Sequence, residues 1–90
     1  MLQRTILLAH GDASALERIV PQLSDLGYEI VGPARTAGAA LALAAVTPVS
    51  FALIGERLAG RRDGRALGQA LRENWGLRCG FLREGAEAAQ

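Results

Sequence analysis

The sequence predicts an α/β domain built on one parallel sheet with helices on both faces. Short apolar runs alternate with longer stretches of helical periodicity along the 90 residues. The apolar runs are nearly unbroken, which is typical of parallel strands that are covered on both sides. Helices of about ten residues or more separate them, long enough for right-handed crossovers. The predicted order of elements is therefore β-α-β-α-β-α-β.

Each predicted strand is a short apolar segment that precedes a glycine, a proline or a polar residue. Proline lacks the N–H group that a central strand needs, so Pro33 is expected to end the second strand. The predicted strands are residues 5–9, 28–32, 49–54 and 77–82.

The first predicted helix lies between Asp12 and Gly27. Asp12 or Ser14 supplies a side chain that can cap its N-terminus, and glycine is a common residue just after a helix. Pro21 falls inside the helical pattern, so we expect a kink or a shortened helix there.

The second and third helices are predicted over residues 37–46 and 64–75. Thr36 can cap the second, and Thr47 followed by proline stops it. In the third, an apolar stripe that ends at Trp75 predicts that this indole anchors the helix in the core.

Composition excludes several classes of function. The ten basic residues balance nine acidic ones, which argues against a nucleic-acid partner. Cys79 is the single cysteine, so neither a disulfide nor a cysteine-rich metal site is expected. No apolar run is long enough to span a bilayer, and no signal peptide is evident. We expect one cytoplasmic domain over residues 1–84 and a short polar tail over 85–90.

Ligands of an open parallel sheet bind beyond the carboxyl ends of its strands. In this chain those ends carry His10-Gly11-Asp12, Gly55-Glu56-Arg57 and Arg83-Glu84. These three short segments are therefore the predicted site.

Four segments together resemble the receiver domains of two-component response regulators. Leu-Gly-Tyr-Glu-Ile-Val-Gly-Pro-Ala at 26–34 is similar to the second-strand region of that family, and 39–44 to its second helix. Arg-Asp-Gly at 62–64 and Gly-Phe-Leu at 80–82 resemble the start of the third helix and the fourth strand. The resemblance covers nearly the whole chain and implies a flavodoxin-like, receiver-like fold in signal transduction.

The resemblance also implies a phosphoacceptor pocket that has lost its chemistry. Receivers phosphorylate an aspartate at the end of the third strand, and that position is Gly55 here. Their magnesium-binding acidic pair falls on His10 and Gly11, which leaves only Asp12, and their hydroxyl residue falls on Arg83. Their lysine has no counterpart, since the chain ends before a fifth strand. We expect no phosphorylation at this site, no metal, no cofactor and no enzymatic activity.

A small anion- or metal-binding domain is the alternative function. His10, Asp12 and Glu56 could converge on a transition metal, and Arg57 with Arg83 could clamp an anion. The competing interpretation is an internal ion pair between Arg83 and Asp12 or Glu56.

The fourth predicted strand is an apolar edge in this shortened fold, and such edges invite pairing with another chain. We expect a homodimer built around Leu77, Cys79, Phe81 and Leu82. The leading hypothesis is a non-enzymatic adaptor or regulator that acts by protein–protein interaction. A histidine kinase or a response regulator is the other expected partner.

Overall fold

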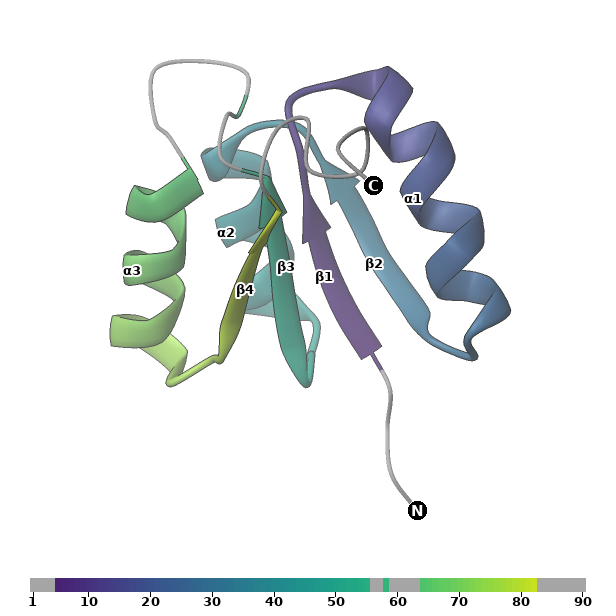
Figure 1. Ribbon diagram of the computed structural model, residues 1–90. Helices are drawn as coiled ribbons and strands as arrows, with labels where there is room; N and C mark the ends of the chain where they lie inside the picture. Colours follow the sequence, from purple (N-terminus) through teal and green to yellow (C-terminus); the bar gives the residue numbers. More distant parts are fainter. Residues whose placement is uncertain (1–4, 56–57, 59–63, 83–90) are drawn as a thin grey trace.

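The computed structural model describes residues 5–55, 58 and 64–82. Over these residues it has a four-stranded parallel sheet in the order β2-β1-β3-β4 and three helices (Figure 1). This confirms the predicted fold class and order. The elements are β1 (Thr5–Ala9), α1 (Ala13–Asp25), β2 (Glu29–Ala34), α2 (Ala37–Val46), β3 (Phe51–Gly55), α3 (Gly64–Trp75) and β4 (Cys79–Leu82).

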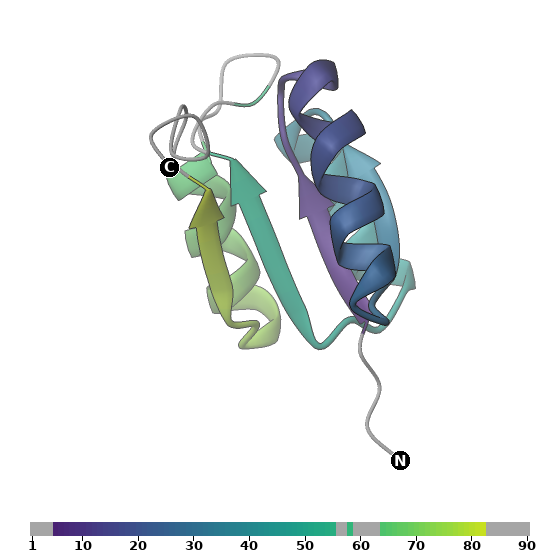
Figure 2. The same cartoon turned by 45° about the vertical axis from the view of Figure 1, so that its right-hand side comes forward.

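The sheet separates two hydrophobic cores, because α1 lies on one face and α2 and α3 lie on the other (Figures 1 and 2). Successive residues of a strand face opposite sides, so Leu7 packs with α2 and α3 while Leu8 packs with α1. Both leucines are fully buried. The core under α1 is the smaller one: it buries Leu8 of β1, and Ile30, Leu53 and Leu82 of the other strands pack against it.

Helix α1 begins after Asp12, whose side chain caps it, and Gly27 follows its end with φ of 91°. Contrary to the expected shortening at Pro21, the helix continues to Asp25. Pro21 removes the hydrogen bond that would reach the carbonyl of Glu17. Both residues are exposed, so water can satisfy that carbonyl.

The prediction that Pro33 ends the second strand was wrong, because β2 extends to Ala34. Strand β2 is an edge strand in the described sheet, where a missing N–H can face away from the neighbouring strand. The pairing with β1 is also irregular here: Leu7 lies opposite Val31, but Ala9 lies opposite Ala34.

Helix α3 has the predicted bounds, and it buries Leu67 and Leu71 fully. Trp75, however, is 44% exposed and is not the expected core anchor. Within the described elements α3 is the outermost helix on its face, above the edge strand β4, so its outer flank has no neighbour to cover it. Of the described helices, none combines the length and the apolar composition that crossing a membrane requires.

Candidate functional site

The carboxyl ends of β1 and β3 lie side by side and bring His10 to Gly55. The two strands pair in parallel, with Ala9 opposite Ile54. His10 is buried, at 8% exposure, and its backbone N–H donates to the carbonyl of Ala34 at 2.9 Å. The ring is also held, because its Nδ1 accepts a hydrogen bond from the Asp12 backbone N–H at 3.0 Å.

The imidazole of His10 closes the space above Gly55. A Cβ atom at position 55 would lie 2.6 Å from Cδ2 and 2.9 Å from Cγ of His10, both closer than real Cβ contacts. On another side, the backbone carbonyl of Gly55 lies against the Cα of Gly64, which leaves no room for a side chain at residue 64. A side chain at residue 55 therefore requires the ring of His10 to move.

The neighbouring residues of the first strand end have local structural contacts. The Asp12 carboxylate accepts a hydrogen bond from the Ser14 N–H at 2.9 Å and so caps α1. The Gly11 carbonyl accepts a hydrogen bond from Nη2 of Arg35 at 2.9 Å. Both contacts tie the loop after β1 to the elements beside it.

Three residues of the predicted anion and metal sites, Glu56, Arg57 and Arg83, lie outside the described residues. Within the described ranges, no three histidine, cysteine, aspartate or glutamate side chains group as metal ligands would. Nδ1 of His10 already accepts a hydrogen bond, so only its other nitrogen is available to a ligand. The roles assigned to Arg57 and Arg83 stay predictions.

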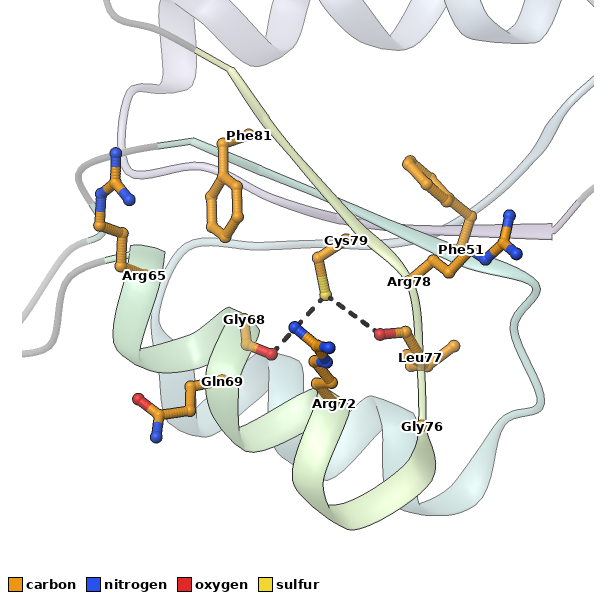
Figure 3. A pocket seen from close by; sticks show the side chains of 10 residues that line it. All are labelled: Phe51, Arg65, Gly68, Gln69, Arg72, Gly76, Leu77, Arg78, Cys79 and Phe81. Carbon is orange, nitrogen blue, oxygen red and sulfur yellow. Dashed lines mark hydrogen bonds between the residues drawn. The ribbon is translucent and has the colours of Figure 1, made fainter.

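A second candidate site lies between α3 and β4, and the sequence did not predict it as a pocket. This α3–β4 groove has a volume of about 590 Å³ and extends along the outer strand (Figure 3). Its lining combines arginines, aromatic rings and the half-buried thiol: Phe51, Arg65, Gly68, Gln69, Arg72, Gly76, Leu77, Arg78, Cys79 and Phe81.

The spacing of α3 explains how the groove forms. Arg65, Gly68 and Arg72 recur at intervals of three and four residues, so they share one face of the helix. A Cβ at Gly68 would lie 2.7 Å from Cζ of Phe81, so the glycine makes room for that ring. The guanidinium of Arg65 lies over the same ring, 5.8 Å from its centroid. This i, i+3, i+7 pattern is the signal that could have identified the groove.

Cys79 is a structural thiol in this groove. Its Sγ lies 3.8 Å from the carbonyl oxygen of Gly68 and 3.7 Å from that of Leu77, as a weak donor (Figure 3). Burial raises the pKa of the Cys79 thiol, and the nearby Arg72 lowers it by less. The thiol is therefore protonated at neutral pH and is a poor nucleophile.

The four residues predicted as a dimer edge lie on both faces of the sheet. Cys79 packs against the core on the α3 side, as does Leu77 just before the strand, whereas Leu82 packs on the α1 side. Phe81 is 44% exposed and lines the groove. Sequence reasoning identified these residues as an edge but did not place Phe51, Arg72 and Arg78 beside them.

Comparisons with known proteins identify relatives by structure. No family model and no curated protein matches the chain. The signal receiver domain of an HD domain-containing protein from Pseudomonas fluorescens Pf-5 is 26% identical with a TM-score of 0.83 over 91% of this chain. A bacteriophytochrome response regulator is 21% identical, with a TM-score of 0.78 over 99%. The anti-anti-sigma factor PhyR from Bartonella quintana is 18% identical, with a TM-score of 0.79 over 90%.

The chain is shorter than these solved structures. It spans 65% of the Pseudomonas chain, 72% of the bacteriophytochrome regulator and 33% of PhyR. The strand order, the helices on both faces and these matches agree. The chain therefore has the fold of a response-regulator receiver domain, shortened to four strands and three helices in its described part.

Proposed function

We propose that this protein is a cytoplasmic, non-enzymatic receiver-like adaptor, which acts by binding other proteins and does not accept a phosphoryl group at the strand-end site. One observation carries the proposal. Position 55, where the resemblance puts the phosphoacceptor, is a glycine, and the ring of His10 occupies the space next to it.

Phosphoryl transfer needs an oxygen nucleophile and a set of charges that stabilises the transferred group. Gly55 offers no nucleophile, and His10 takes the place of a magnesium-binding carboxylate. The nearby carboxylate of Asp12 caps α1. The residues at this strand end therefore serve packing and helix capping, which supports the proposal that the site accepts no phosphoryl group.

The phosphorylation part is tested with acetyl phosphate and Mg²⁺, followed by intact-mass spectrometry. We expect no acid-labile phosphoryl adduct under conditions that label an ordinary receiver domain. An acyl phosphate mapped to a strand-end residue would contradict the proposal.

The packing argument is tested by putting the missing side chain back. Gly55→Asp should lower the free energy of unfolding by about 1–3 kcal/mol, since the new side chain meets the ring of His10. Adding His10→Ala should recover part of this loss. Gly38→Asp is the matched control, because nothing lies within 4 Å of a Cβ there. Equal losses at the two glycines would show that the ring does not close position 55.

We assign protein binding to β4, one of the two edge strands of the described sheet. A second copy can pair with this edge across a two-fold axis, and a histidine kinase or a response regulator is the other expected partner. Multi-angle light scattering of the purified protein should give the mass of a dimer that dissociates on dilution. A monomer at all concentrations would remove the homodimer from the proposal.

A further inference from the structure

Among the described strands, β4 has no neighbour along its outer side. The N–H of Ala52 in β3 donates to the carbonyl of Arg78 at 2.9 Å, and Ala52 lies opposite Cys79. In a parallel pair, alternate residues of a strand bond to the neighbour. The N–H and C=O groups of Cys79 and Phe81 therefore point away from β3, toward the position that another strand would take.

The side chains of the same two residues line the α3–β4 groove, together with three exposed arginines, Arg65, Arg72 and Arg78. Among the described residues that line the groove, none is acidic. Glu73, the acidic residue of α3, accepts its hydrogen bond from Gln69 at 3.0 Å. The lining therefore has an excess of positive charge beside its apolar surface.

The arginines and rings are distributed along the groove. Figure 3 shows Arg65 beside Phe81 at one end and Arg78 beside Phe51 at the other, with Arg72 between them. Each end combines an apolar ring with a guanidinium group, but the two ends lie on opposite faces of the sheet. Phe81 faces α3, whereas Phe51 lies on the same face of β3 as Leu53, which packs on the α1 side. Guanidinium groups pair well with carboxylates, and rings favour apolar side chains.

We propose that the α3–β4 groove binds an extended acidic segment of a partner protein, which adds a strand to β4. The backbone of the segment bonds to the outward peptide groups of Cys79 and Phe81. Carboxylates on the α3 side of the segment pair with Arg65 and Arg72. Apolar side chains on its other side contact Phe51, beside which Arg78 adds positive charge. This inference rests on the proposed adaptor function and names the chemistry of its partner.

Charge favours an acidic segment over a second copy of this chain. Two copies paired along β4 bring two sets of the same arginines together, which costs free energy. Self-pairing therefore strengthens as added salt screens the repulsion, whereas binding of an acidic segment weakens with salt. The acidic segment competes with the second copy for the same edge.

The test uses a short fluorescent peptide of alternating valine and glutamate, with binding followed by fluorescence anisotropy. We expect saturable binding that weakens at least several-fold between about 0.05 and 0.3 M salt. The combined variant Arg65→Gln, Arg72→Gln and Arg78→Gln should bind the peptide about tenfold more weakly. Arg35→Gln is the matched control, because Arg35 follows the opposite edge strand β2. This variant should bind the peptide as the parent does. Thermal melts of both variants check that they remain folded.

The same peptide with glutamine in place of glutamate should bind at least several-fold more weakly. Equal affinity for the two peptides, or for the parent and the triple variant, overturns the inference. Tighter binding of ATP, used as a competing small anion, than of the peptide would also overturn the inference. If the inference fails while light scattering still shows a dimer, the proposed adaptor function stands without this partner. A monomer that binds the peptide removes the homodimer and keeps the inference.

Discussion

The two edges of the described sheet differ in how well they are protected from pairing. Strand β2 has a proline without an N–H group at Pro33, an irregular register with β1, and the exposed charge of Glu29. These are the devices by which proteins discourage edge-to-edge association. Strand β4 has no proline, no charge and no register shift within Cys79–Leu82, and its Phe81 is 44% exposed. From this difference we expect partners to pair with β4 and not with β2.

The largest effect on stability is expected in helix α3, which packs against the edge strand β4. Leu71 of α3 is fully buried, and α3 packs on β3 and β4. Leu71→Ala should lower the free energy of unfolding by about 2–5 kcal/mol, because it leaves a cavity under that side of the sheet. Chemical denaturation measures the loss, and Val46→Ala, at a side chain that is 79% exposed, is the control. A loss below about 1 kcal/mol would mean that α3 contributes little to the β4 side.

A charge placed on each edge compares the two directly. Phe81→Lys should weaken self-association about tenfold or more, which corresponds to about 1.4 kcal/mol, because it adds a positive charge beside the arginines of the groove. Glu29→Lys on β2 should leave the association unchanged. Sedimentation equilibrium measures both. Equal weakening by the two variants would show that pairing is not confined to β4.

The contact between Arg35 and Gly11 fixes the chain just after the protected edge. Arg35 donates from Nη2 to the Gly11 carbonyl at 2.9 Å in an exposed setting. Arg35→Ala should cost about 0.5–1 kcal/mol in the free energy of unfolding, the lower part of the range for such a bond. Arg35→Lys keeps a donor and should lose less. Equal losses of stability with lysine and with alanine at residue 35 would show that the hydrogen bond to Gly11 is not their cause.

The smallest expected effect is a pH dependence of stability that comes from Cys79 in β4. Burial raises the pKa of the Cys79 thiol above its ordinary value of 9.0. The unfolded chain therefore releases this proton first, so the stabilisation is complete below about pH 9 and is lost as the pH rises through the raised pKa. Cys79→Ala should flatten this alkaline loss of stability in thermal melts. An unchanged pH profile would mean that the thiol is not desolvated.

Much of the fold could be predicted because local signals and tertiary packing agree. Thr36 caps α2 through the Ala39 N–H at 3.1 Å, and α2 has the predicted bounds. Every residue of the apolar run at Thr5–Ala9 is buried, as a central parallel strand requires. The structural roles of Pro33 and Trp75 were predicted wrongly. They depend on where the strand lies in the sheet and where the helix lies in its layer. An edge strand tolerates the missing N–H, and an outermost helix leaves its flank uncovered.

The strand-end site was predictable only where a residue directly follows a strand. Such a position places Gly55 next to the residue after β1, but the contact of the His10 ring with Gly55 depends on a rotamer that sequence does not specify. The α3–β4 groove joins residues from β3, α3 and β4. The spacing of Arg65 and Arg72 along α3 can be read from the sequence, but Arg78 and Phe51 join them only after folding.

The contact between His10 and Gly55 also limits how the sequence can change over evolutionary time. An aspartate that appears at position 55 alone meets the imidazole ring, and a smaller residue at position 10 alone leaves a void above the glycine. Each single step is therefore less stable than the present pair. Substitutions at positions 10 and 55 are therefore coupled, and an aspartate at position 55 costs least when residue 10 becomes smaller at the same time.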